Sequence, residues 1–284
     1  MGSEARAKAI NAKGIGLMVG FVAVVQLVAL YFTYVNTPVT IQVGATYAPA
    51  GTSPAGSFSN ALLLVAAVLA STLVAVWLIR RRRARIFTSV VYLGTSLALF
   101  LLTLLTADDV TSSYMSEYPA LYLSLVLSAG VVALFALSVR RRRFLFVAPF
   151  ITGLLSAEVG SYFAAEIPLY TALLLPLIFS IYDIYAVFAG PLRQLVTIAP
   201  TEVLSAVTSQ LGEFSIGTGD TIFYSMLPAL ALYQFNAYYA LWTLLAVDLG
   251  VVITLYLLSK SKMLPGLPVP MALGLGTLVL MIVR

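Results

Sequence analysis

The chain has 284 residues, of which 61% are hydrophobic and only 10% are charged, and its mean hydropathy is +1.01. This composition excludes a soluble globular domain and indicates a polytopic membrane protein. The chain contains no histidine and no cysteine, which excludes thiol nucleophiles, Ser-His pairs and zinc sites of the HExxH or thiolate type.

Nine segments are apolar enough to cross a bilayer, whose hydrocarbon core of about 30 Å needs roughly 20 helical residues. We therefore predict an all-α polytopic membrane fold with nine transmembrane helices. The predicted spans are residues 14–35, 61–79, 86–106, 121–139, 144–165, 169–190, 217–235, 240–258 and 264–283. The whole chain, 1–284, is expected to form a single membrane domain, with six helices in 1–190, a cytoplasmic connection in 191–216 and three helices in 217–284.

The basic residues orient these spans. With a cytoplasmic N-terminus, fifteen of the 16 Lys and Arg residues fall on the cytoplasmic side, and only Arg284 does not. The external connections then carry Asp108, Asp109, Glu117 and Glu166. The positive-inside rule therefore predicts a cytoplasmic N-terminus and an external C-terminus. We interpret the arginine runs, and with them the net charge of +5, as membrane-surface anchors and predict no nucleic-acid partner.

Two aspartates lie inside these apolar segments, and an acid within the membrane predicts a functional site. Asp183 precedes Arg193 by ten residues and Asp220 follows Glu213 by seven, which corresponds to roughly 15 Å and 10 Å of helix. Both acids should therefore lie in the cytoplasmic half, facing each other from adjacent antiparallel helices. Two such carboxyls share one proton, so one can act as a base towards water and the other as an acid towards a carbonyl.

The backbone near both aspartates is predicted to depart from regular helix. Gly217 and Gly219 precede Asp220, and glycine lets the backbone leave the helix and lets other groups come close. Three prolines stand in the stretch MLPGLPVP at 263–270. Because proline has no amide donor, this stretch cannot begin as regular helix and leaves free carbonyls at the depth of the aspartates.

Three short motifs resemble those of a known family. They are Tyr182-Asp183, Gly217-Thr218-Gly219-Asp220 and Pro265-Gly266-Leu267-Pro268. In order and spacing they resemble the YD, GxGD and PAL motifs of presenilins and signal peptide peptidases, and the IFYS run after GxGD is more similar to presenilin. The resemblance implies a presenilin-like fold, Asp183 and Asp220 as the catalytic pair, and supporting or substrate-binding roles for the other motif residues.

The resemblance also implies the activity and its setting. It implies an intramembrane aspartic endopeptidase that hydrolyses peptide bonds within transmembrane segments or signal peptides, without cofactor or metal. We expect a prokaryotic-type homologue in the plasma membrane, acting on single-span peptides without accessory subunits, and the oligomeric state is left open. Gly266 stands where the family has alanine. The 191–216 connection is too short for the loop that presenilins cut during maturation, so we expect an intact chain.

The connection itself has mixed character. Residues 195–199 resemble a strand that could pair with substrate together with the 265–267 backbone, whereas the residues after Pro200 could form an amphipathic interfacial helix.

Other interpretations of the membrane acids stay open. The aspartates could carry protons or cations in a transporter or channel, although no inverted repeat is evident. A prepilin or preflagellin peptidase shares GxGD, but those families carry a lysine where this chain has Ile222. A catalytically inactive homologue is disfavoured because both aspartates are present. For Glu158 and Asp248, neither of which sits in a comparable motif, we expect structural or proton-transfer roles.

Overall fold

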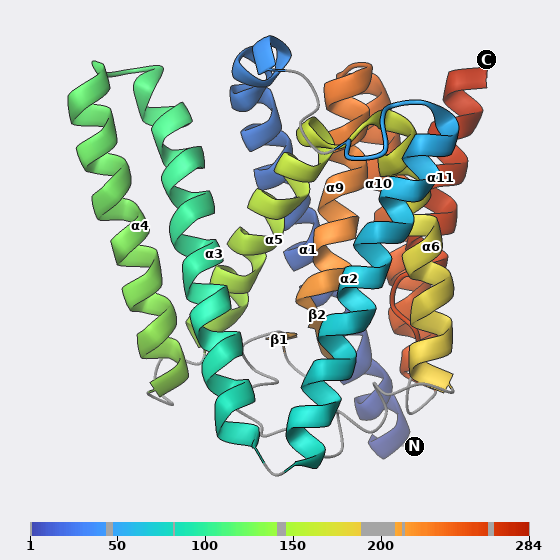
Figure 1. Cartoon of the computed structure of the whole chain (residues 1–284). Coiled ribbons are helices and arrows are strands. Elements are labelled where there is room, and N and C mark those ends of the chain that lie inside the picture. Colours follow the sequence, from blue (N-terminus) through green and yellow to red (C-terminus); the bar gives the residue numbers. More distant parts are fainter. Residues whose placement is uncertain are drawn as a thin grey trace.

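The computed structural model describes residues 2–43, 48–81, 83–140, 146–188, 208–211, 214–260 and 264–283. These residues form nine helices and one two-stranded hairpin, and one helix lies in each predicted span (Figure 1). The helices are α1 (Gly2–Val43), α2 (Pro54–Arg80), α3 (Ala84–Ser112), α4 (Glu117–Arg140), α5 (Ala148–Glu166), α6 (Leu169–Phe188), α9 (Thr218–Gln234), α10 (Ala237–Leu258) and α11 (Pro268–Val283). The strands are β1 (Thr208–Leu211) and β2 (Phe214–Gly217).

Apolar composition accounts for this helical architecture. Six helices of the described part, α1, α2, α3, α4, α6 and α10, are long and apolar enough to cross a membrane, and α11 is apolar but shorter. A helix satisfies its own backbone hydrogen bonds, which a lipid environment requires. The protein is therefore an integral multi-pass membrane protein. The N- and C-termini lie at opposite ends of the bundle (Figure 1).

Helix α9 is the centre of the bundle. It packs against α1, α5, α6, α10 and α11. Every residue from 223 to 231 is buried, as expected for a helix that is apolar all round and covered on all sides. Asp220 lies in the first turn of this helix, so the packing of α9 fixes where that carboxyl lies.

Small and hydroxyl-bearing residues bring α5 close to α9. The Ser156 and Thr221 hydroxyls lie 2.6 Å apart, and the Ser225 hydroxyl donates to the Ser156 carbonyl at 2.9 Å. A Cβ at Gly160 would lie 2.3 Å from Ser225 Oγ and 2.9 Å from the backbone nitrogen of Met226. Close approach of this kind is how helices associate without a hydrophobic driving force between them. It holds the start of α9 against α5.

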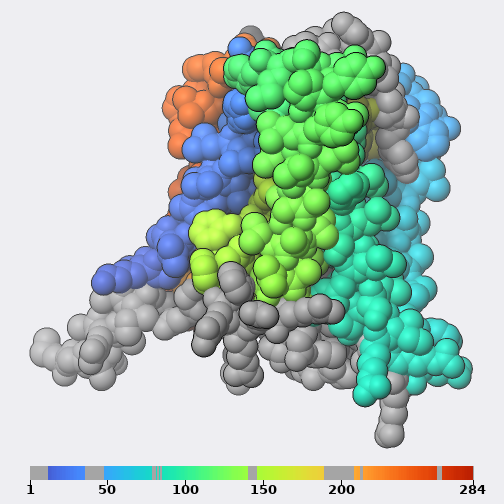
Figure 2. All heavy atoms as spheres, turned by 90° about the vertical axis from the view of Figure 1, so that its left-hand side faces the viewer, coloured from blue at the N-terminus to red at the C-terminus, as the bar shows by residue number. Residues whose placement is uncertain are grey.

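Helices α3 and α4 form a peripheral hairpin. They share a small core with α5 that contains Leu99, Phe135, Ile151 and Leu155. The outer face of α4, which runs down the middle of Figure 2, exposes large apolar side chains. An exposed apolar surface of this kind suits contact with lipid chains.

Several helix boundaries differ from the predicted spans: α1 covers Gly2–Val43 rather than 14–35, and α2 begins at Pro54 rather than at 61. Asp108 and Asp109 lie in the last turns of α3, not in a connection, because the helix continues to Ser112 beyond its apolar stretch. The last helix begins at Pro268, not at residue 264. Proline is favoured at the first helical position because its fixed φ suits the helix and its missing amide has no helical partner there.

The hairpin departs from the all-α prediction. β1 and β2 are antiparallel, with Thr208 opposite Gly217 and Leu211 opposite Phe214. The Ser209 hydroxyl lies 2.7 Å from that of Thr152 on α5, which anchors β1 to the bundle. The predicted interfacial helix after Pro200 is therefore wrong where it reaches β1, because strand pairing and this anchor outweigh local helical preference. The predicted strand at 195–199 lies outside the described residues.

Candidate active site

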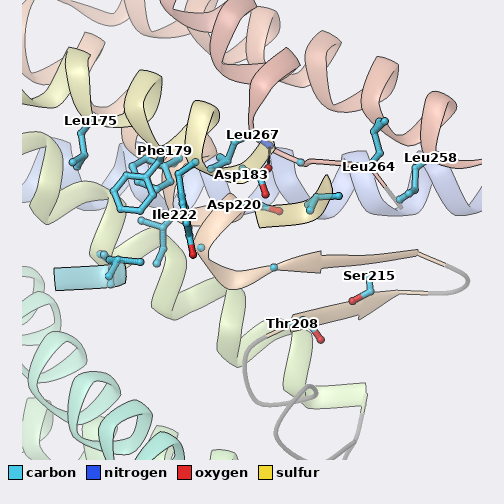
Figure 3. Close-up of a pocket in the computed structure, with 18 of the residues that line it drawn as sticks. Leu175, Phe179, Asp183, Thr208, Ser215, Asp220, Ile222, Leu258, Leu264 and Leu267 are labelled. Carbon is cyan, nitrogen blue, oxygen red and sulfur yellow. Dashed lines mark hydrogen bonds between the residues drawn. The ribbon is translucent and has the colours of Figure 1, made fainter. Parts of the chain in front are cut away.

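Asp183 and Asp220 lie beside each other on the wall of a cavity. Asp183 comes from α6 and Asp220 from the start of α9, and both line a cavity of about 1000 Å³ (Figure 3). Their carboxyl groups interact electrostatically. The pairing of acids from the sixth and seventh predicted spans is thus present in the structure.

The remaining wall of the cavity is largely apolar. Its side chains come mainly from α2, α5, α6 and α9, and they include Leu64, Val68, Val159, Phe163, Leu175, Phe179, Ile222 and Phe223. Thr208 of β1 and Ser215 of β2 line the same cavity and both are visible in Figure 3. An apolar cavity with a few convergent polar groups is the usual form of a binding site. It suits an apolar chain segment whose reacting group meets the two acids.

The segment before α11 contacts Asp183 through its backbone. The Leu267 amide donates to Asp183 Oδ2 at 3.0 Å. The Leu267 carbonyl accepts from the Met271 amide at 3.0 Å, so Leu267 directly precedes the first turn of α11. The positive end of the α11 dipole therefore faces the carboxyl of Asp183. Proline at position 268 places the helix start where this contact forms.

Gly266 lies against the second acid. A Cβ built on Gly266 would lie 2.4 Å from Asp220 Oδ2 and 3.4 Å from the Tyr224 hydroxyl oxygen. The Tyr224 hydroxyl donates to the Gly266 carbonyl at 2.8 Å. The glycine therefore lets the backbone approach Asp220, in the position where the resembling family has alanine.

The predicted supporting residues divide into two groups. Those that line the cavity are Tyr182, Gly217, Gly219, Gly266 and Leu267. Pro265 and Pro268 are not among its lining residues, and Pro268 begins α11 instead. The functional roles of both groups remain predictions.

The Tyr182 hydroxyl is a polar group without a partner at this cavity. It is buried and makes no hydrogen bond within the described part of the chain. Other atoms of Tyr182 line the cavity, whereas the hydroxyl itself is buried. Gly217 ends β2 in an extended conformation and directly precedes α9, so it joins the hairpin to the helix that carries Asp220.

The two other membrane acids lie elsewhere. Glu158 is fully buried between α3 and α5, where its Oε1 accepts a hydrogen bond from the Thr106 hydroxyl at 3.2 Å. Asp248 on α10 interacts with the side chain of Gln26 on α1. Neither lines the cavity. Among the described residues, no group of three or more acids gathers where a metal ion could bind.

Tyr224 is the site residue whose role the sequence did not predict. It lies four residues after Asp220, so the two side chains share one face of α9. That spacing could have suggested a contact, but its partner, Gly266, is 42 residues away in the chain.

The whole arrangement is similar to two solved structures, each described as a presenilin family intramembrane aspartate protease. The first, in space group C222, has a TM-score of 0.64 and 23% identity, and the alignment covers 95% of this chain and 99% of that chain. The second, in space group P2, has a TM-score of 0.63 and 20% identity, with coverage of 91% and 95%. No protein-family model and no curated protein matches the sequence. The chain thus has the fold of presenilin family intramembrane aspartate proteases.

Proposed function

We propose that the protein is an intramembrane aspartic endopeptidase with Asp183 and Asp220 as its catalytic pair. The observation that carries the proposal is the meeting of these two acids, from adjacent helices of a membrane bundle, on the wall of a largely apolar cavity. The likeness to presenilin family proteases supports the same activity. It does not favour the transporter, channel or prepilin peptidase interpretations.

In the proposed reaction the pair holds one proton between its two members. The ionised carboxylate takes a proton from water as the water oxygen bonds to the scissile carbonyl carbon. The protonated carboxyl gives its proton to the carbonyl oxygen, which yields a gem-diol. The gem-diol then collapses: one of its hydroxyls gives a proton to the ionised carboxylate as the C=O bond of the product acid forms and the C–N bond breaks. The amine nitrogen takes its proton from the other, protonated carboxyl, so the dyad again holds one proton.

The substrate proposed here is an extended stretch of a transmembrane segment. A helix satisfies its own backbone bonds, so it must unwind locally before hydrolysis and then needs new hydrogen-bond partners. β2 borders the cavity through Ser215 and Gly217, and the 265–267 backbone lies beside both acids. We propose that substrate adds as a strand between these two segments. This gives to β2 the docking role that the sequence suggested for 195–199.

The proposed setting follows from the charge pattern. We propose that all nine helices cross the plasma membrane of a prokaryote, with the N-terminus cytoplasmic and the C-terminus outside. We propose that the enzyme acts as an intact chain that forms a single membrane domain. Its substrates are single-span peptides, and it needs no accessory subunits.

Incubation of the purified protein in detergent with a single-span reporter tests the activity. Mass spectrometry of the products should show cleavage within the reporter's transmembrane segment. An aspartyl transition-state inhibitor should block it. Absence of cleavage products across several reporters, or cleavage that the inhibitor leaves unchanged, would overturn the proposal.

A further inference from the structure

A proline inside α9 leaves one carbonyl of that helix without its usual donor. In a regular helix the amide of residue 228 would donate to the carbonyl of residue 224. Residue 228 is Pro228, which has no amide hydrogen and whose ring pushes that carbonyl aside. Both residues are buried in the centre of the bundle, where water cannot supply the missing hydrogen bond. The Tyr224 carbonyl therefore needs a donor from another helix.

Gln26 of α1 supplies that donor. Its side-chain amide donates to the Tyr224 carbonyl at 3.3 Å, across 198 residues of sequence. Gln26 has 0% exposure and lies within a membrane span whose other buried residues are mostly apolar. Burying an amide in such surroundings is unfavourable unless it forms hydrogen bonds. The position of Gln26 is thus matched to the carbonyl that Pro228 leaves free.

The carbonyl held by Gln26 belongs to the tyrosine that contacts the active site. The Tyr224 hydroxyl donates to the Gly266 carbonyl at 2.8 Å, and Gly266 lies against Asp220. The next residue, Leu267, donates its amide to Asp183. A displacement of Tyr224 would therefore move the backbone that touches both acids.

Asp248 of α10 lies near the same amide side chain. Its carboxyl interacts with Gln26, and α10 packs against both α1 and α9. Gln26 Oε1 and Asp248 Oδ1 are buried and have no hydrogen-bond partner within the described residues. Among the described residues, the hydrogen bond that holds the Gln26 amide nitrogen is the one to the Tyr224 carbonyl.

We propose that Gln26 is a positioning residue for the active site, which replaces the helical donor that Pro228 removes from α9. This inference rests on the proposed protease function for its kinetic consequence, but its structural consequence can be measured without activity. Gln26 contacts neither Asp183 nor Asp220. It acts through Tyr224 and the Gly266–Leu267 backbone.

A rescue experiment separates this role from simple packing. Gln26→Leu removes the donor at similar volume, and we expect a fall in kcat of about tenfold with KM changed by less than about twofold. Pro228→Ala restores the helical amide at position 228. In the double variant we expect kcat to recover to within about threefold of wild type, since Tyr224 regains a donor. Pro228→Ala alone should change kcat by less than about threefold, because Gln26 remains.

Pro176 provides the matched control. It is a second proline inside a membrane helix, α6, and Pro176→Ala restores an amide that faces a different carbonyl. Combined with Gln26→Leu it should give no recovery. Equal recovery with either alanine, or none with Pro228→Ala, would overturn the inference.

Hydrogen–deuterium exchange gives the second measurement. Gln26→Leu should speed exchange in the peptide that contains Leu267, and the added Pro228→Ala should reverse this. If the wild-type protein cleaves no reporter, the proposed function fails and the exchange result alone decides the inference. If the wild type is active and exchange at Leu267 is unchanged in Gln26→Leu, the positioning role is wrong while the protease proposal stands.

Discussion

The bundle holds acids in two different surroundings. Asp183 and Asp220 lie beside a cavity, close to each other and to the backbone of 266–267. Glu158 is fully buried between α3 and α5, bonded to the Thr106 hydroxyl, and does not line that cavity. All three are acids within membrane helices, but Glu158 is fully buried whereas Asp183 and Asp220 are partly exposed. The difference is access: a substrate can reach only acids that border a space large enough to hold it.

The comparison is tested most strongly by removing one acid at a time. Asp183→Asn and Asp220→Asn should each lower cleavage at least about a hundredfold, because neither acid alone can both activate water and protonate the carbonyl. Cleavage of the single-span reporter measures this, and unchanged thermal unfolding in detergent shows that the fold is kept. Residual activity above a few per cent of wild type in either variant, judged against this order-of-magnitude expectation, would contradict the dyad.

The pH profile of cleavage is the second test. A pair that works with one shared proton loses its base when both carboxyls are protonated and its acid when both are ionised, so kcat should fall towards both low and high pH. The chain has no histidine or cysteine to mimic such a profile near neutrality. Glu158→Gln and Asp248→Asn should leave both limbs in place. If the fall in kcat at low or at high pH disappears in either variant, that fall is due to ionisation of the substituted acid.

Close packing of α10 against α11 should affect both stability and activity, because α11 directly follows the 264–267 segment. A Cβ at Gly250 of α10 would lie 2.4 Å from the Pro270 Cα of α11, a backbone atom that cannot move without its helix. Overpacking of this kind costs about 1–3 kcal/mol, so Gly250→Ala should lower both thermal stability and kcat, the latter about tenfold. Gly276→Ala is the control, because no atom lies within 4 Å of its added Cβ. Equal effects of the two changes would show that the contact at Pro270 is unimportant.

The start of α11 should act on the site through its backbone. Pro268→Leu restores an amide and lets the helix extend towards Leu267, so we expect a fall in turnover of about fivefold. Leu267→Ala keeps the amide that donates to Asp183 and should cost about twofold. Turnover of the reporter at saturating concentration distinguishes them. If both variants match wild type, the motif serves only to begin a helix.

The smallest effect is expected at Glu158. Glu158→Gln keeps the oxygen that accepts from Thr106 and changes only Oε2, which has no hydrogen-bond partner within the described part of the chain. We expect activity within about twofold of wild type and a change in unfolding free energy below about 1 kcal/mol. Loss of activity comparable to Asp183→Asn would mean that Glu158 takes part in the reaction.

Much of this protein follows from local features of its sequence. Long apolar stretches predict helices because lipid offers no partner to an unpaired backbone group, and each predicted span contains one helix. The absence of histidine and cysteine leaves few chemistries for the membrane acids. Helix depth places Asp183 and Asp220 at the same level, and the two lie together in the structure. Helix ends do not follow from the apolar pattern. Asp108 and Asp109 lie within α3 because a helix continues past its apolar residues when no local signal stops it.

Contacts between distant segments were decided by the tertiary structure alone. Four residues of β1 form a strand because β2 pairs with them and Thr152 of α5, 57 residues from its partner Ser209, anchors them. The Gly266 backbone reaches Asp220 because α10 and α11 pack closely enough to bring it there. In the sequence, Gln26 is an isolated amide in an apolar segment, and nothing near Pro228 indicates a partner for it. Only packing of α1 against α9 places the amide at the carbonyl that the proline leaves free, because the spacing between two helices is not encoded in the local pattern of either one.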